Sequence, residues 1–171
     1  MDEAFIKKVQ PNSPEAEQSV IGAMIMDRDA IADVIDIVNA DDFYQKQNGI
    51  LFEAMTELYR EGKPVDLVTL QNKLKKKDVP ESMKSLEFIR DLLEAVPTSA
   101  NAKQYAKIVS EKATLRKLIK VTEDITTECY LGKDDVTEIL DHTEKNVFGL
   151  LQQASGREDF VPIDKVVLNT L

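Results

Sequence analysis

The sequence predicts an all-α protein: a globular helical head, then a long antiparallel helical hairpin, then a C-terminal segment. Three observations predict this class. Apolar residues make up 43% and charged residues 31% of the 171 residues, with only 6% aromatic, which is typical of soluble, helix-rich chains. Apolar residues recur at the helical period. All six prolines can be placed at segment boundaries, where a residue without an N–H is tolerated. We expect the head over 1–97, the hairpin over 98–154 and the C-terminal segment over 155–171.

The first helix of the head should begin at Ser13-Pro14-Glu15. A hydroxyl cap, a proline in the first turn and an acidic side chain all suit the N-terminus of a helix. We expect this helix to run to about Met26, and Asp29 to cap the second helix.

Three more short helices complete the predicted head. The apolar residues of 50–58 follow the helical spacing, and Gly62 should end that helix. Asp66 then caps a fourth helix over 67–74, and a fifth helix carries the apolar residues of 89–96.

The hairpin is predicted from uninterrupted length. Residues 102–130 contain neither proline nor glycine, and a helix of that length spans about 43 Å. Residues 131–133 form a turn, and Asp134 or Asp135 caps a second long helix that runs to about Ala154. A short connection between two long helices gives an antiparallel pair.

Helical-wheel positions divide the apolar residues of the hairpin into stripes. The second helix has one stripe, as packing against a single partner helix requires; it is formed by Val136, Ile139, Leu140, Thr143, Val147, Leu150, Leu151 and Ala154. The first helix has a matching stripe, formed by Tyr105, Ile108, Val109, Leu115 and Ile119. Leu118, Val121 and Ile125 fall on nearly the opposite side, and Phe148 falls outside its own stripe. We expect either the head or another protein to cover these residues.

The charge pattern bears on binding partners. A formal net charge of −9 argues against duplex-DNA binding by this domain, because such binding relies on Lys and Arg replacing condensed counterions. Residues 103–120 hold six basic side chains against Glu111 alone, and residues 123–144 hold eight acidic ones against Lys133. In the hairpin the acidic block forms the tip and the basic block lies nearer the base. Two antiparallel hairpins would place the acidic tip of each against the basic block of the other, so we predict self-association through the hairpins.

The sequence contains no recognisable catalytic or nucleotide-binding constellation. The pairs Gly62-Lys63 and Gly132-Lys133 lack both the earlier glycine and the following hydroxyl residue of a phosphate-binding loop. Cys129 is the only cysteine, so no internal disulfide is available. We therefore expect no enzymatic activity, metal or cofactor in this chain.

Other polar features favour structural roles. His142, the only histidine, should be a partly exposed helix residue, and the acidic doublets 41–42 and 134–135 should cap helices rather than bind metal. The lysines of 73–77 should form a solvated helix end, with a phosphate contact as the alternative. No apolar run is long enough to span a bilayer, and residues 1–10 are too charged for a signal peptide, so we expect a cytoplasmic protein.

An ordered series of segments carries a family resemblance. The segments, in chain order, are Pro11 to Gln18, Val20 to Ala23, Asp42-Phe43-Tyr44, Ile50 to Met55, Pro64-Val65-Asp66 with Thr69-Leu70, Val96 to Asn101, and Tyr105-Ala106, continuing through Val109 to Leu118. Together they resemble the N-terminal domain of bacterial replicative DNA helicases of the DnaB type, over nearly the whole chain. Lys46 and Asn48 stand where the family often has proline and histidine, and a glycine usual near Lys77 is absent. These departures touch helix starts and turns.

The resemblance implies a collar domain rather than a motor. In such helicases six copies form a trimer of dimers that receives primase and, in some species, a helicase loader. A separate domain hydrolyses ATP with magnesium and translocates on single-stranded DNA, and it would begin beyond residue 171. The resemblance also makes 155–171 a linker and the start of a linker helix, in which Val167, Leu168 and Leu171 would dock on a neighbouring motor domain.

The resemblance and the wheel together give a candidate primase-facing surface. It comprises Glu15, Phe88, Ile119 and Ile125, with Val121 and Phe148 as second choices. Ile125 is chosen for its place off the inner stripe, whereas Ile119 rests on the family's use of the hairpin and is otherwise internal to it. Two other functions stay open: a free-standing helical adaptor and an unrecognised enzyme that uses clustered carboxylates.

Overall fold

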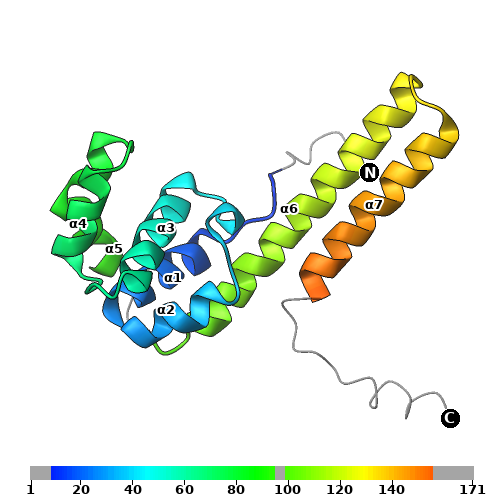
Figure 1. Cartoon of the computed structure of the whole chain (residues 1–171). Helices are drawn as coiled ribbons and strands as arrows, with labels where there is room; N and C mark the ends of the chain where they lie inside the picture. The colour runs from blue at the N-terminus through cyan, green and yellow to red at the C-terminus, as the bar shows by residue number, and fades with distance from the viewer. Residues whose placement is uncertain (1–8, 95–98, 156–171) are drawn as a thin grey trace, which may run out of the picture. The chain divides into compact units, whose positions relative to one another are not determined.

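A computed structural model describes residues 9–94 and 99–155, and every regular element in that range is a helix (Figure 1). This confirms the predicted all-α class. The chain divides into two compact units, residues 1–113 and residues 114–171. None of the described helices is long and apolar enough to cross a membrane.

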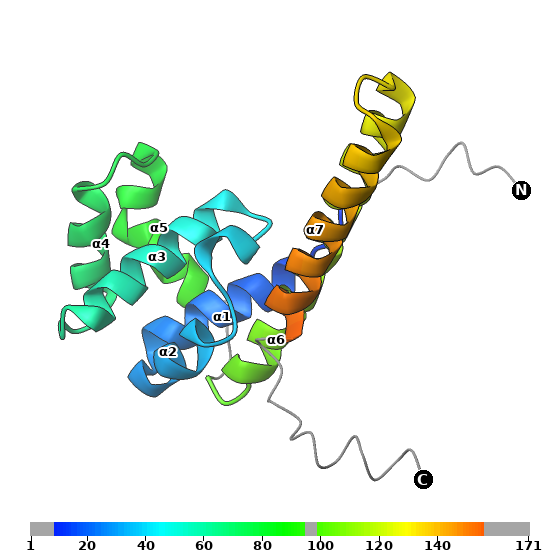
Figure 2. The same ribbon diagram turned by 45° about the vertical axis from the view of Figure 1, so that its right-hand side comes forward.

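The first unit, here called the head, is built from short helices. Their bounds are α1 Pro14–Met26, α2 Arg28–Ile35, the 3-10 turn η2 Ala40–Asp42, α3 Lys46–Arg60, α4 Leu67–Lys75, the 3-10 turn η3 Glu81–Lys84 and α5 Leu86–Glu94. α1 contacts α2, α3 and α5, and α4 packs against both α3 and α5, as the two views of Figures 1 and 2 show. The long helices α6, Ala102–Leu131, and α7, Val136–Ser155, follow.

Local sequence signals place most helix ends. Ser13 caps α1 by accepting from the backbone N–H of Ala16, with proline in the first turn, and Asp66 caps α4. Gly62 lies beyond the end of α3 with φ +69°, in the left-handed region that favours glycine. The expected cap at Asp29 is wrong: α2 begins at Arg28, so the cap lies two residues earlier, at Asp27, whose side chain accepts from the N–H of Asp29.

The core of the head contains one buried carboxylate. Glu17 is 2% exposed and lies among the buried apolar residues of α1. Its Oε1 accepts from the backbone N–H of Tyr44 at 2.6 Å, and its Oε2 accepts from the N–H of Gln45 and from Nδ2 of Asn48, both at 3.1 Å. Because these donors precede and open α3, Glu17 of α1 satisfies the unpaired N–H groups at the start of another helix.

The start of α6 belongs to the head. Ala102, Ala106 and Val109 are buried in the head core, and Tyr105 and Ile108 pack against it half-buried. The sequence expectation that Tyr105, Ile108 and Val109 form a stripe toward the second hairpin helix is therefore wrong. The compact unit extends to Ala113, while the expected boundary at residue 97 lies outside the described residues.

Ion pairs join α3 to α4. Glu53 and Glu57 of α3 and Glu61 at its C-cap recur one turn apart, and Lys73 of α4 and Lys77, two residues past the end of α4, bridge them at 2.7 to 3.1 Å. Hydrogen bonds from Lys77 and Lys73 lower the pKa of Glu57, and those from Lys63 and Lys73 lower the pKa of Glu61 to about 2. Lys73 and Lys77 are therefore neither a solvated helix end nor an open phosphate site.

Candidate protein-interaction surface

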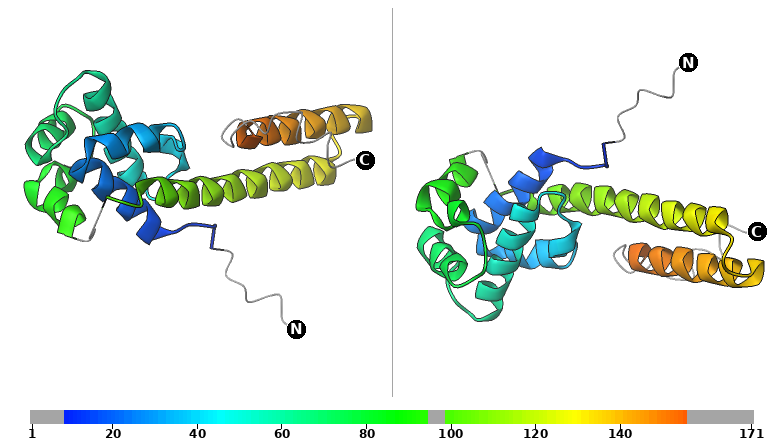
Figure 3. Two further views of the ribbon diagram at one scale, coloured as in Figure 1. Left: turned by 90° about the horizontal axis from the view of Figure 1, so that it is seen from below. Right: turned by 90° about the horizontal axis from the view of Figure 1, so that it is seen from above.

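The second unit is a helical hairpin whose two helices are joined by a short turn. Gly132 adopts φ +56° after α6, and the carbonyl of Asp135 accepts from the N–H of Ile139 in the first turn of α7. These positions confirm the predicted turn and the second long helix. Figures 1 and 3 show the last turns of α6 running antiparallel beside α7.

The hairpin has no buried core of its own. From residue 114 to residue 154, no described side chain falls into the buried class, whereas the head contains more than twenty buried apolar residues. Two helices bury only one stripe each on one another, so a free hairpin of this kind is marginal in water. Its apolar residues therefore need another surface.

The inner face of α6 is the one that carries Val121 and Ile125. These residues and Glu128 recur at the helical spacing and so share one face, and Glu128 contacts Nδ1 of His142 on α7 at 2.9 Å. All three are only partly exposed. The sequence expectation placed Val121 and Ile125 opposite the inner stripe; it is wrong because the stripe was continued from the first turns of α6, which pack in the head.

The exposed apolar residues of α7 form a second face. Leu140 is 63% exposed, and Phe148 and Leu151 are each 59% exposed. Ile139, Thr143, Val147 and Leu150 are half-buried and occupy the neighbouring arc of the wheel. We call Val136, Leu140, Phe148 and Leu151 the outer α7 face. The prediction that the whole stripe packs against one partner helix is therefore wrong for Val136, Leu140 and Leu151, because the stripe is wider than the arc that one helix covers.

The outer α7 face is able to supply binding energy. Complete burial of one large apolar side chain is worth about 1.5 to 3 kcal/mol. Leu140, Phe148 and Leu151 are each more than half exposed, so covering the exposed parts of the three would contribute about 3 to 5 kcal/mol. That amount is a useful part of a protein–protein affinity.

The structure separates the predicted primase-facing residues. Glu15 is exposed in the first turn of α1, and Phe88 of α5 is half-buried against the head core. Val121 and Ile125 lie on the inner face of the hairpin, while Ile119 lies on the opposite side of α6 with the exposed Leu115. Phe148 is exposed on the outer α7 face. The predicted linker residues Val167, Leu168 and Leu171 lie outside the described residues.

The hairpin contains few side chains of the types that commonly act in catalysis. His142 contacts one carboxylate, and Cys129 is exposed on α6. Across the part of the chain that the structure describes, no group of three or more His, Cys, Asp or Glu side chains is placed to hold a metal ion. What the described residues of the hairpin offer is the exposed outer α7 face.

Comparisons with known proteins give consistent matches. The family model of the DnaB-like helicase N-terminal domain matches residues 9–111. The replicative DNA helicase DnaB of Geobacillus stearothermophilus is 35% identical over 153 residues, which are 90% of this chain and 34% of that protein. The replicative DNA helicase DnaC of Bacillus subtilis is 34% identical over 170 residues, 99% of this chain and 37% of that protein. The chain thus spans about a third of the length of these curated relatives.

Solved structures share the fold. The crystal structure of the N-terminal domain of DnaB helicase from Mycobacterium tuberculosis aligns with a TM-score of 0.78 and 34% identity, over 82% of this chain and 99% of that one. The N-terminal domain of DnaB helicase from Helicobacter pylori, described together with its interactions with primase, aligns with a TM-score of 0.59 and 24% identity, over 68% of this chain and 90% of that one. At that identity the second likeness concerns the fold alone.

Proposed function

The chain belongs to the family of DnaB-like helicase N-terminal domains, and on that premise we propose that it is a collar domain of a replicative DNA helicase. In this role it assembles with copies of itself as dimers and as a trimer of dimers, and it docks primase during DNA replication. The observation that carries the proposal is the outer α7 face, which leaves Leu140, Phe148 and Leu151 largely exposed.

The proposal assigns catalysis to a part of the protein beyond this chain. The full-length protein would be an ATP-dependent DNA helicase, with ATP and magnesium bound by a motor domain, and it would work in the cytoplasm. This chain would hold subunits in a defined geometry and raise the local concentration of primase at the fork. A helicase loader is a further partner to test.

Self-assembly is supported by both the apolar face and the charge of the hairpin. Residues 103–120, which run from the head into the hairpin, carry six basic side chains against one acidic, and residues 123–144 carry eight acidic against one basic, so two copies with antiparallel hairpins would attract one another. Exposed charges are screened by salt. Sedimentation of the chain should therefore show dimers that weaken with added salt, and Leu140→Glu should abolish them. A monomer at high micromolar concentration in low salt would contradict self-assembly through the hairpin.

Primase docking is supported by family membership; the H. pylori domain, which was described together with its interactions with primase, shares the fold. Calorimetric titration of primase into the chain tests it with Phe148→Ala, because that side chain is 59% exposed and its loss leaves the hairpin packing intact. We expect the dissociation constant to rise about tenfold or more, as for a central apolar contact. Lys145→Ala, an exposed polar change on the same helix, is the matched control.

The expected effect of Ile125→Ala differs from that of Phe148→Ala. Because it lies on the inner face with Val121, Ile125→Ala should lower the melting temperature of the hairpin as well as weaken primase binding. If Phe148→Ala and Leu151→Ala both leave primase affinity unchanged, the outer α7 face is not the docking surface.

A further inference from the structure

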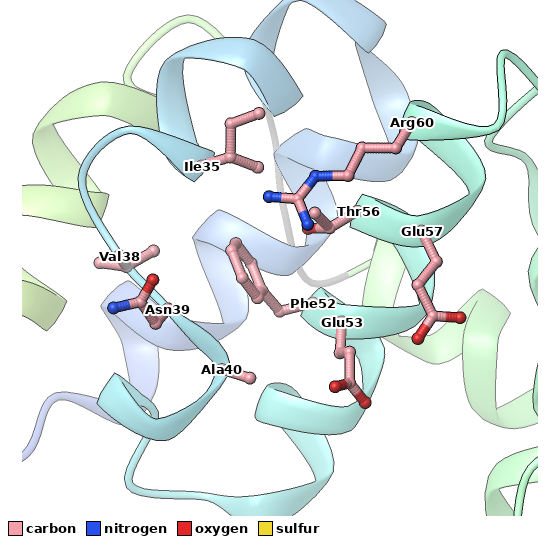
Figure 4. Close-up of a pocket in the computed structure, with 9 residues that line it drawn as sticks. All are labelled: Ile35, Val38, Asn39, Ala40, Phe52, Glu53, Thr56, Glu57 and Arg60. Carbon is pink, nitrogen blue, oxygen red and sulfur yellow. The ribbon is translucent and has the colours of Figure 1, made fainter.

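A cavity is lined by residues of the head alone. It has a volume of about 260 Å³ and opens between α3 and the segment that follows α2 (Figure 4). Its apolar lining comes from Ile35, Val38, Ala40 and Phe52, and its polar lining from Asn39, Glu53, Thr56, Glu57 and Arg60. No predicted primase-facing residue lines it.

Thr56 brings an unsatisfied hydroxyl to this cavity. The residue is 6% exposed, and its Oγ1 is buried without a hydrogen-bond partner among the described residues. Other helical threonines behave differently: Thr126 and Thr143 donate to the carbonyl one turn earlier at 2.7 and 2.8 Å. A buried hydroxyl without a partner costs free energy, and the residue that carries this one lines the cavity.

Arg60 adds a positive charge one turn further along α3. Its exposed side chain forms no hydrogen bond or ion pair with the described residues, and Arg60 lines the same cavity as Thr56, as labelled in Figure 4. The two glutamates of the lining are already committed, since Lys77 and Lys73 hold Glu57 at 2.7 and 2.9 Å and Lys77 also holds Glu53 at 3.1 Å. The unneutralised charge of the lining is therefore positive.

We propose that this cavity binds the C-terminal residue of a peptide, with its carboxylate on Thr56 and Arg60 and its apolar side chain against Phe52 and Ile35. A guanidinium and a hydroxyl donate to a carboxylate in strong, charge-assisted hydrogen bonds. A volume of about 260 Å³ is below that of sites for drug-sized ligands, so carboxylate and apolar group must sit close together. A terminal residue carries both on one Cα, whereas an internal acidic residue would leave the apolar wall uncovered.

Fluorescence anisotropy with two peptides tests the proposal. The probe is a labelled five-residue Gly/Ser peptide ending in leucine, with either a free carboxylate or a C-terminal amide. We expect the free acid to bind about tenfold or more tightly than the amide, because the amide loses the charge-assisted bonds. Arg60→Gln should remove this preference, and Arg90→Gln, at an exposed arginine of α5 that does not line the cavity, should keep it.

Thr56→Val gives an independent readout. It removes the hydroxyl and keeps the shape, so it should weaken binding of the free acid while raising the melting temperature of the ligand-free chain. Equal affinity for the two peptides, no binding at millimolar peptide, or equal losses in Arg60→Gln and Arg90→Gln would each overturn the proposal. These outcomes leave the collar function untouched, because the proposal does not rest on it.

Discussion

The substitution Glu17→Gln should destabilise the head although it changes no side-chain volume. Glu17 presents two acceptor oxygens to three donors: the backbone N–H groups of Tyr44 and Gln45, and Nδ2 of Asn48. A glutamine replaces one oxygen by an NH₂ group, which then faces at least one buried donor. In the least costly orientation the NH₂ faces Tyr44, and the remaining two bonds lose their charge assistance.

The magnitude follows from these bonds. One hydrogen bond to a charged acceptor contributes about 1.5 to 3 kcal/mol, and weakening of the other two adds about 1 kcal/mol. We expect Glu17→Gln to lower the free energy of unfolding by about 2 to 4 kcal/mol. The matched control is Glu15→Gln on the same helix, since Glu15 is exposed and its change should cost under about 0.5 kcal/mol.

Urea unfolding followed by far-ultraviolet circular dichroism measures this difference. With a slope of about 2 kcal/mol per molar urea, the midpoint of Glu17→Gln should fall by about 1 to 2 M relative to Glu15→Gln. Hydrogen exchange should also speed up at the backbone N–H groups of Tyr44 and Gln45. If the two variants unfold at the same urea concentration, Glu17 does not hold the start of α3 as described.

Three further perturbations test the head. Gly49→Ala should lower the free energy of unfolding by about 1 to 2 kcal/mol, because a Cβ there would lie 2.6 Å from the carbonyl oxygen of Ala40 and the resulting strain exceeds the gain in helix propensity. Thermal unfolding measures this loss, and an unchanged or raised melting temperature would contradict the close approach. Asp66→Ala should cost about 1 kcal/mol by removing the cap of α4, seen as a lower urea midpoint that Asp78→Ala does not share. The pKa values of Glu57 and Glu61 are lowered in the folded chain, that of Glu61 to about 2. Their contribution to stability is therefore present above the ordinary carboxyl pKa and is lost as the pH falls through the folded values. The urea midpoint should decrease as the pH is lowered from about 4.5 to 2, and Glu61→Gln should make this decrease with pH smaller.

Local signals in the sequence sufficed to predict the helices of the head. Ser13, Asp66 and Gly62 act through bonds or backbone angles within a few residues, and such effects can be recognised without knowledge of the fold. Asp27 was missed as a cap because Asp29, two residues later, is an equally good cap by type. Only the packing of α2 decides between them.

Roles that depend on contacts between distant segments could not be predicted from the sequence. The function of Glu17 depends on α3, which starts many residues later, although its position on the apolar side of α1 near Val20, Ile21 and Met24 was a usable signal. One helical wheel was applied to the whole of α6, although its first turns pack in the head and its last turns pack in the hairpin. For that reason the wheel placed Ile125 on an outer face. The wheel of α7 also predicted that the whole stripe packs on one helix, and only the structure shows that Leu140 and Leu151 stay exposed.

The exposure of the outer α7 face is the claim on which the collar function depends most. Hydrogen exchange of the backbone N–H groups around Leu140 and Leu151 tests it most directly, in the dilute chain, in the concentrated chain and in the chain mixed with primase. We predict slower exchange over α7 at high concentration or with primase than in the dilute chain. Identical exchange over α7 in all three samples would contradict the claim that this face meets another molecule.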